Sequence, residues 1–543
     1  VPVAPTDIQI AGFAKYASAG FRALQTCFSC TIGAMTNRDE NSGTSKYTER
    51  AAGVLLHITS LPSPWGVGDI GPGAVSFADF LCRSGQRYWQ MLPIGPTDGA
   101  LGDSPYSGES AFGGNVLFIN PEWLAEDGLL TKDDLSGSIR LPEGKALYDE
   151  ARALKYPLFK KAFAKARNDS IENDFQRFKA ENAFWLDDYA CFLVCKERFE
   201  GKPWFLWPRD LRDREPEAMS ALLREAAYDL EFYRFCQFLF GRQWERLRGH
   251  CSQKGIYLVG DIPIYVSHDS ADVWAHRELF RLDEAGRATE VAGVPPDYFS
   301  KDGQRWGNPL YRWDIMKERG FRWWTGRLKR SLGLFDILRI DHFRGFFGYW
   351  TVPASEATAK NGWWEQGPGD AFFKTLRERF PDLPFLAENL GVITPDVTEG
   401  IQALGVPGMR VLLFGFDGNL EENPHYPAQH APRDWVYTGT HDNDTSRGWL
   451  KNEASPEARK NLESVLGKVP EQGSVAGALV AMAMESPCET AIIPIQDILD
   501  LGSSARLNRP SKRKGNWLWR LRPGDTNPDI AAELGETTVR AGR

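Results

Sequence analysis

The chain has 543 residues, 42% of them hydrophobic, and a formal net charge of −8 from 64 basic and 72 acidic residues. Its length and apolar content suffice for a large core, and a mild acidic excess without a long basic run argues against a nucleic-acid partner. The longest apolar stretch, near 475–484, is shorter than the roughly 20 residues of a membrane-spanning helix, so we expect no membrane span.

The eight cysteines are too sparse for a disulfide scaffold and mostly lie in apolar or helical surroundings, which indicates a reducing, cytoplasmic location. Cys27 and Cys30 have the spacing of a redox or metal pair, but no second pair accompanies them, so no metal site is predicted. Residues 1–34, rich in Ala, Thr, Ser and Phe, are compatible with a transit-like segment, which would indicate a plastid, or with an over-extended start before Met35. We treat residues 1–50 as a poorly defined extension.

The first convincing elements are a strand over 53–58, a helix over 74–84 and a strand over 87–92. This β-α-β opening predicts a parallel sheet. From about 121 to 250, apolar residues recur at helical spacing over a segment too long for one crossover, which predicts a helical insertion. A strand over 255–261 follows, and then a second, loop-rich and aromatic insertion over about 266–313.

Five more strands are expected, with helices between most of them, over 335–341, 384–388, 409–414, 435–442 and 489–494. Eight strands joined in this way predict an α/β fold, a (β/α)8 TIM barrel with its active site at the C-terminal strand ends. We assign the barrel to 51–520 and a C-terminal tail to 521–543. About fifty residues follow the eighth strand, too few for a separate C-terminal β-sandwich domain.

Four apolar strands run directly into an acidic residue, at Asp261, Asp341, Glu388 and Asp442. Because the carboxyl ends of barrel strands meet at one face, we expect these acids to share a site. A helix cap or a surface ion pair explains one acid at a strand end, but not four. Carboxylate pairs are the usual equipment for breaking glycosidic bonds.

The neighbours of the acids indicate different roles. Arg339 lies two residues before Asp341, on the same side of the strand, and would keep that carboxylate ionised as a nucleophile requires. Glu388 follows an apolar run, and burial there would raise its pKa so that it holds a proton as a general acid. His342 and His441 are candidates to bind sugar hydroxyls. These patterns alone do not decide between Asp341 and Asp442 as the nucleophile.

Seven motifs in a fixed order resemble those of the amylomaltases, the 4-alpha-glucanotransferases or disproportionating enzymes of glycoside hydrolase family 77. The resemblance covers about 53–520. The motifs lie at 102–106 (Gly-Asp-Ser-Pro-Tyr), 260–265 (Gly-Asp-Ile-Pro-Ile-Tyr), 293–299 (Gly-Val-Pro-Pro-Asp-Tyr-Phe), 303–311, 338–344 (Leu-Arg-Ile-Asp-His-Phe-Arg), 387–391 and 437–443 (Tyr-Thr-Gly-Thr-His-Asp-Asn).

The resemblance implies that Asp341 is the nucleophile, Glu388 the acid/base and Asp442 the transition-state stabiliser, with Arg339, His441 and Asp261 in contact with the sugar or the acids. The implied reaction moves a segment of a 1,4-alpha-glucan to the 4-hydroxyl of an acceptor glucan or glucose by retaining double displacement, without metal or organic cofactor. The implied substrates are maltooligosaccharides and glucans derived from starch or glycogen.

Aromatic residues in loops near the predicted site are candidate sugar platforms, because sugars present flat CH faces that stack on rings. They are Tyr106, Tyr298, Phe299 and Trp306. By resemblance, the loop with Tyr298 and Phe299 overhangs the acceptor side of the cleft. The alternative is that these rings anchor a loop that otherwise lacks a core.

One position and one segment depart from the family pattern: Val116 stands where Pro is common, and 506–514 differs from the usual Arg-Met-Asn-x-Pro-Gly-Thr. We expect neither to touch the acids. Two other functions compete with transfer. One is an alpha-1,4-glucan hydrolase with the same carboxylates, which the aromatic loop and the missing C-terminal β domain disfavour only weakly. The other is a silent glucan-binding protein, which the presence of all the acids disfavours.

Overall fold

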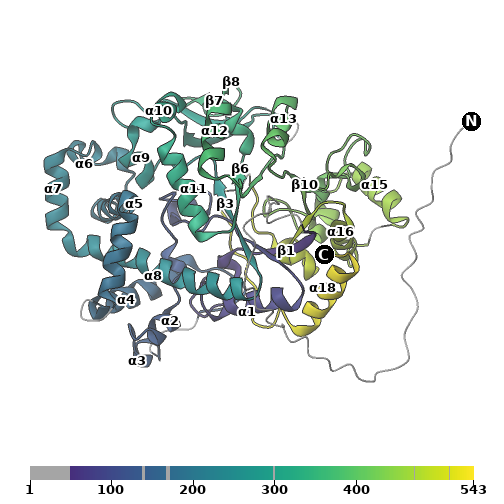
Figure 1. Cartoon of the computed structure of the whole chain (residues 1–543), viewed down its shortest axis with the longest axis horizontal. Helices are drawn as coiled ribbons and strands as arrows, with labels where there is room; N and C mark the ends of the chain where they lie inside the picture. Colours follow the sequence, from purple (N-terminus) through teal and green to yellow (C-terminus); the bar gives the residue numbers. More distant parts are fainter. Residues whose placement is uncertain are drawn as a thin grey trace, which may run out of the picture. The chain divides into compact units, whose positions relative to one another are not determined.

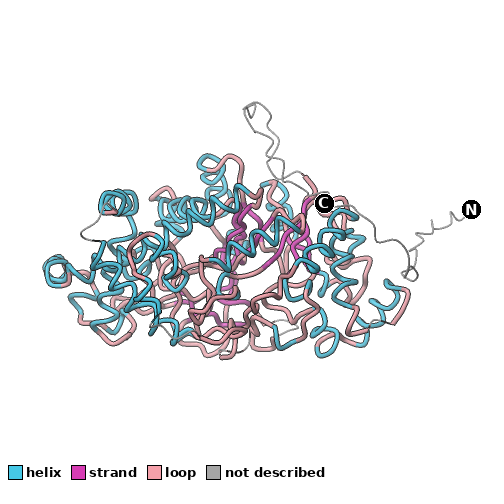
Figure 2. Tube along the Cα trace, turned by 90° about the horizontal axis from the view of Figure 1, so that it is seen from below, coloured by secondary structure: helices cyan, strands magenta, loops and turns pink. Residues whose placement is uncertain are grey.

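The computed structural model describes residues 49–136, 141–166, 171–296, 300–469, 471–510, 512 and 514–543. Its centre is an eight-stranded parallel sheet in the order β10-β11-β12-β1-β2-β3-β6-β9, which Figure 2 shows surrounded by helices. The strands are β1 (Ala51–Leu55), β2 (Tyr88–Gln90), β3 (Tyr257–Pro263), β6 (Ile337–Asp341), β9 (Phe385–Ala387), β10 (Met409–Val411), β11 (Trp435–Tyr437) and β12 (Thr490–Pro494).

The two outer strands of this order, β9 and β10, approach each other and nearly close the sheet. The Ala387 amide donates to the Pro407 carbonyl at 2.9 Å, and the Met409 amide donates to Asn389 Oδ1 at 2.7 Å. Helices lie between most consecutive strands. The predicted (β/α)8 TIM barrel is therefore confirmed, with a strand at each of the eight expected places.

Close strand packing explains a glycine in the first strand. Gly53 pairs with Tyr88 on one side and Ile492 on the other. A Cβ at position 53 would lie 2.4 Å from both the Cβ and the carbonyl oxygen of Tyr88. Only glycine lets β1 approach β2 this closely, and this register aligns the strand ends that carry the site.

The helical insertion forms one side of the molecule, at the left in Figure 1. Its long helices α5 and α8 pack on each other, and α8 also packs on the barrel elements α1 (Pro72–Arg83) and β3. The insertion consists of α2 (Pro121–Glu126), α3 (Lys132–Ser136), α4 (Tyr148–Ala166), α5 (Glu172–Arg198), α6 (Arg209–Arg212), α7 (Pro216–Glu225) and α8 (Ala227–Gln253).

The second insertion contains part of an antiparallel sheet that is not predicted from the sequence. Strands β4 (Glu290–Val294) and β5 (Gln304–Pro309) are joined by β7 (Gly348–Pro353) and β8 (Trp363–Gln366) in an antiparallel sheet of order β5-β4-β7-β8. Half of this sheet comes from the segment after β6. Short strands whose partners are separated from them in the sequence by a barrel strand leave no local sequence pattern.

The remaining helices cover the barrel and hold the end of the chain. The segment predicted as a tail contains α18, which packs on α1, and Gln86 Nε2 donates to Thr538 Oγ1 at 2.8 Å. These helices are α9 (Ala271–Ala275), α10 (Trp313–Glu318), α11 (Arg322–Leu334), α12 (Gly369–Arg379), α13 (Pro395–Leu404), α14 (Ser446–Asn452), α15 (Pro456–Leu466), α16 (Val475–Glu485), α17 (Ile495–Ile498) and α18 (Pro528–Arg540).

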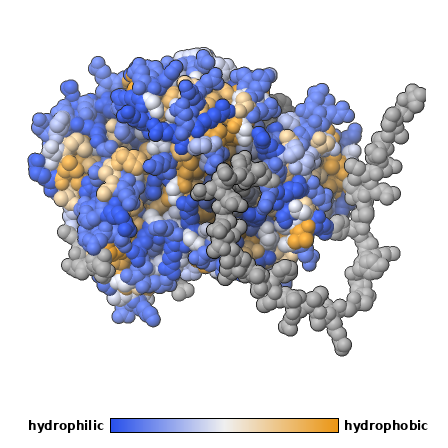
Figure 3. Space-filling model, in the orientation of Figure 1, coloured by the Kyte–Doolittle hydropathy of each residue, from blue (hydrophilic) through white to orange (hydrophobic). Residues whose placement is uncertain are grey.

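The face of the molecule in Figure 3 is mostly hydrophilic, with scattered apolar groups. Such scattered groups are normal for a globular surface. Within the part of the chain that the structure describes, none of the helices combines the length and the apolar character that crossing a membrane requires.

Candidate active site

An arginine in the middle of β6 holds two of the predicted acids together. Arg339 Nη1 donates to both carboxylate oxygens of Asp261, at 2.8 and 2.7 Å. Its Nη2 donates to Asp341 Oδ1 at 2.8 Å. Arg339 and Asp261 face each other in the β3–β6 register and are buried, whereas the Asp341 side chain remains 32% exposed. Asp341 is thus an oriented, charge-paired carboxylate that a substrate can reach.

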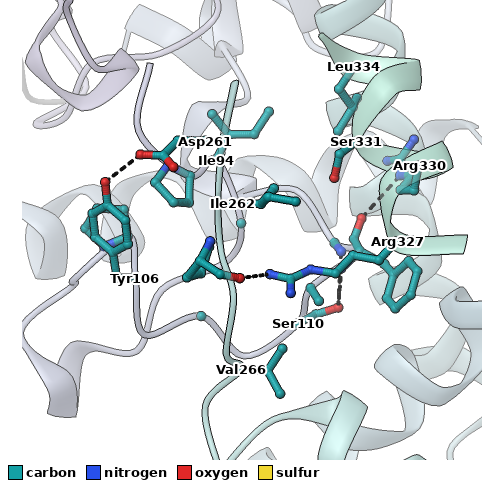
Figure 4. Close-up of a pocket in the computed structure, with 18 of the residues that line it drawn as sticks. Ile94, Tyr106, Ser110, Asp261, Ile262, Val266, Arg327, Arg330, Ser331 and Leu334 are labelled. Carbon is teal, nitrogen blue, oxygen red and sulfur yellow. Dashed lines mark hydrogen bonds between the residues drawn. The ribbon is translucent and has the colours of Figure 1, made fainter. Parts of the chain in front are cut away.

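Tyr106 extends this cluster towards the loop after β11. Its hydroxyl donates to Asp261 Oδ2 at 2.6 Å, as Figure 4 shows, and its ring stacks on His441 with centroids 5.1 Å apart. Burial raises the pKa of Tyr106 well above its ordinary value, so the phenol stays a hydrogen-bond donor. Burial also raises the pKa of Asp261, and Arg339 opposes that shift.

Glu388 follows β9 and accepts two backbone hydrogen bonds. The His342 amide donates to Oε2 and the Leu390 amide to Oε1, both at 2.7 Å. Burial, followed by the negative charge of Asp341, raises the pKa of Glu388 to about 7, while Arg339 and the two amides oppose the shift. Glu388 therefore holds a proton near neutral pH, as a general acid must.

His342 lies between the acids and the second insertion. Its backbone is left-handed, with φ of 54°, which turns the chain sharply after Asp341. Burial lowers the pKa of His342 to about 4, so its ring is neutral and offers both a donor and an acceptor. The rings of His342 and Trp306 lie edge to face, with their centroids 4.8 Å apart and their planes at 88°. Trp306 is 39% exposed and is available as a sugar platform.

Asp442 is held by the segment near the C-terminus. Asn508 Nδ2 donates to Asp442 Oδ1 at 2.6 Å, Arg506 Nη2 donates to the Asp442 carbonyl at 2.8 Å, and His441 Nε2 lies 3.4 Å from Oδ1. The expectation that 506–514 does not touch the acids is therefore wrong. Arg506 and Asn508 are positions at which this segment keeps the family pattern, a signal that the sequence already contained.

These contacts gather nine of the predicted site residues at one end of the barrel. Tyr298 and Phe299 lie outside the described residues. In the described ranges, no cluster of three or more His, Cys, Asp or Glu side chains could hold a metal ion. The contacts also include four residues that are not predicted from the sequence: Leu390, Arg506, Asn508 and Trp517. Leu390 contributes only its backbone amide, whereas the other three contact residues distant in sequence, with the Trp517 ring centroid 6.0 Å from that of His441.

A cavity of about 620 Å³, open to solvent, adjoins this cluster. Tyr106 and Asp261 line it on one side and α11 lines it on the other (Figure 4). Across the cavity, Arg327 Nη2 donates to the carbonyl of Pro263, the last residue of β3, at 2.8 Å. The α11 helix thereby supports the strand end that carries Asp261.

Residues 56–526 match the family model described as 4-alpha-glucanotransferase, glycoside hydrolase family 77. The chain belongs to this family. The 4-alpha-glucanotransferase of Thermus thermophilus is 46% identical over 494 residues, covering 89% of this chain and 97% of that protein. The chloroplastic/amyloplastic 4-alpha-glucanotransferase of Arabidopsis thaliana is 42% identical and covers 89% and 83%.

Solved structures agree with this assignment. An amylomaltase from Streptococcus agalactiae in complex with acarbose superposes with a TM-score of 0.87 at 35% identity, covering 91% of this chain and all of that chain. An amylomaltase from Corynebacterium glutamicum, at 19% identity and a TM-score of 0.74, shares the fold. The protein is thus a 4-alpha-glucanotransferase that acts on alpha-glucans.

Proposed function

We propose that this 4-alpha-glucanotransferase works by retaining double displacement, with Asp341 as nucleophile and Glu388 as acid/base. The observation that carries the proposal is the contrast between the two carboxyls. Asp341 is paired with Arg339 at 2.8 Å, while burial raises the pKa of Glu388 to about 7. One ionised and one protonated carboxyl is the combination that retaining glycoside cleavage needs.

In the first step, Glu388 donates its proton to the glycosidic oxygen while an Asp341 oxygen attacks the anomeric carbon. The leaving glucan departs as an alcohol, and the donor segment stays bound to Asp341 as an ester. In the second step, Glu388 removes the proton from the 4-hydroxyl of an acceptor glucan or glucose. That oxygen attacks the anomeric carbon and releases Asp341.

Asp442 and His441 are proposed to bind hydroxyls of the sugar being cleaved, and Asp442 to stabilise the positive charge that develops on it. Asn508 Nδ2 donates to the Asp442 carboxylate at 2.6 Å, so the carboxylate is oriented before the substrate arrives. Asp261, Arg339 and Tyr106 form one wall of the site together with Asp442 and His441, since Tyr106 binds Asp261 and stacks on His441. His342 offers its neutral ring to the sugar on the Glu388 side.

Transfer requires that an acceptor sugar, rather than water, reaches the covalent intermediate. Trp306, 39% exposed and in edge contact with His342, is the described residue best placed to bind an acceptor ring and displace water. Tyr298 and Phe299 are proposed to act with it. The two insertions, at about 121–250 and 266–313, serve in this proposal to support the barrel and to supply the acceptor loops.

The proposed substrates are maltooligosaccharides and glucans derived from starch or glycogen, with glucose as the smallest acceptor. Several buried cysteines are free thiols, which supports a reducing compartment such as the cytoplasm or a plastid stroma. They are Cys191, Cys195, Cys236, Cys251 and Cys488.

Incubation with maltotriose alone tests the transfer step. We expect glucose together with a ladder of longer maltooligosaccharides, whereas glucose and maltose without longer chains would indicate hydrolysis. The mechanism is tested with Glu388→Gln and a maltosyl fluoride, whose leaving group needs no proton. A maltosyl adduct on the peptide with Asp341, found by mass spectrometry, supports double displacement. The same peptide unmodified, with the fluoride consumed, contradicts it.

A further inference from the structure

Trp364, on β8 at the edge of the four-stranded sheet, has an unusually open position for a tryptophan. Its side chain is 44% exposed. The guanidinium of Arg344 lies 4.1 Å from the ring centroid, and Trp350, the cross-strand neighbour on β7, packs against it at 5.3 Å and 71°. The ring is thus held in place on one face and one edge while a large part of it stays open to solvent.

The support of this ring belongs to the same chain segments as the acid/base. Arg344 lies two residues after His342, whose amide binds Glu388. Arg344 Nη1 also donates to the Val392 carbonyl, four residues after Glu388. Trp364 is therefore connected to the Glu388 side of the site, and not to the wall formed by Asp442.

A second exposed tryptophan marks the other end of the same short segment. Trp306 contacts His342, and Trp364 contacts Arg344. Two half-exposed indoles thus flank residues 342–344 directly beside Glu388. An exposed aromatic ring contributes little to the stability of the fold. A guanidinium that stacks on one face of the ring fixes its orientation.

The neighbouring tryptophan on the same strand provides a contrast. Trp363 is similarly exposed, at 41%, but successive strand residues point to opposite faces. Its Nε1 donates to Glu365 Oε1 at 3.0 Å, within a group of polar side chains that includes Arg281. The hydrogen-bond partner of Trp363 is therefore Glu365 rather than the loop after Glu388, and Trp363 serves as a matched control.

We propose that Trp364 forms an outer acceptor subsite, in which its open face stacks on a glucose unit of an alpha-1,4-glucan beyond the sugar that receives the transferred segment. This inference rests on the proposed function, since it assigns the acceptor side from the position of Glu388. A long acceptor reaches Trp364, whereas glucose, which occupies only the position next to the cleaved bond, does not.

The test compares acceptors of two lengths with one donor. Amylose serves as donor, and either isotopically labelled glucose or maltopentaose with a fluorescent reducing end serves as acceptor. Only labelled products longer than the added acceptor are counted. For Trp364→Ala we expect the KM for maltopentaose to rise about 3- to 10-fold, the effect of losing one aromatic contact. The KM for glucose and kcat stay as in the wild type.

Two variants separate the inference from general damage. Trp364→Phe retains a ring and is expected to lie between wild type and Trp364→Ala, and Trp363→Ala is expected to leave the ratio of the two KM values unchanged. An equal change in both KM values for Trp364→Ala, or an equal response to Trp363→Ala, overturns the subsite. A wild-type enzyme that makes no longer products would instead overturn the proposed function itself.

Discussion

Arg339 and Asp341 stand two residues apart on β6, and Arg339 Nη2 donates to Asp341 Oδ1 at 2.8 Å while its Nη1 is occupied by Asp261. One guanidinium therefore joins a buried carboxylate to an accessible one. The buried pair fixes the arginine, and the arginine fixes the direction of the accessible carboxylate. Only a planar group with several donors can bind both acids at once.

Replacing Arg339 with lysine tests this arrangement. A lysine keeps the positive charge but cannot contact Asp261 and Asp341 together, so we expect kcat/KM for disproportionation to fall at least about 100-fold. Steady-state kinetics on maltotriose measures the loss, and circular dichroism checks that the barrel is folded. A folded Arg339→Lys protein with activity within threefold of wild type would contradict the orienting role.

The raised pKa of Glu388 predicts a pH dependence. A general acid acts in its protonated form, so kcat/KM is expected to fall as the pH rises through about 7, the pKa of Glu388. Because the charge of Asp341 helps to raise this pKa, Asp341→Asn should move it down towards the ordinary value. Carbon-13 NMR titration of labelled glutamate in Asp341→Asn and wild type measures the shift, with Glu388→Gln identifying the signal. An unchanged titration would contradict the coupling.

The contact between Asn508 and Asp442 gives a third prediction. Asn508→Ala removes the donor at 2.6 Å, and we expect about a tenfold lower kcat from the loss of one oriented hydrogen bond to a charged group. Asn508→Asp places a second carboxylate beside Asp442 and should lower kcat further. Arg509→Ala, at the exposed neighbouring position, is the control and should retain wild-type kcat. Equal activity in all three variants would contradict a role of Asn508 in orienting Asp442.

Arg344 is expected to be a positioning residue for Glu388. Arg344→Leu removes the donor to the Val392 carbonyl and loosens the loop whose Leu390 amide binds Glu388. We expect kcat to fall about tenfold with glucose and maltopentaose alike, and the basic limb of the pH profile to shift. Arg344→Lys, which keeps one donor, should recover part of both. A lower kcat with an unchanged pH profile would indicate a purely structural role.

The sequence revealed the site only where its information is local. Asp341 and Glu388 were predictable because apolar strands run into them, and Arg339 because side chains alternate along a strand. The hydrogen bonds from the Tyr106 hydroxyl to Asp261 and from the Asn508 amide to Asp442 join residues far apart in the chain, so the fold is needed to establish these contacts, although Asn508 stands at a position that keeps the family pattern. The same holds for the four-stranded sheet, in which Gly293 on β4 pairs with Trp350 on β7 although β6 lies between them in the sequence.

A buried ion pair between α4 and the loop after β1 gives the last prediction. Lys155 Nζ contacts Asp69 Oδ2 at 3.1 Å and donates to the carbonyls of Leu117 and Ile119 at 2.6 and 3.0 Å, and both side chains are at most 1% exposed. Removing one partner leaves an unpaired buried charge. We therefore expect Lys155→Met to lower the free energy of unfolding by about 3–5 kcal/mol.

Thermal and urea unfolding of Lys155→Met measure this loss, and Arg177→Ala is the matched control because its pair with Asp174 on α5 is largely exposed and exposed pairs contribute little. Since Lys155 joins the helical insertion to the barrel rather than to the acids, kcat of the folded variant should stay near wild type. Equal stability of the two variants would show that the three oxygen contacts of Lys155 do not fix the insertion on the barrel.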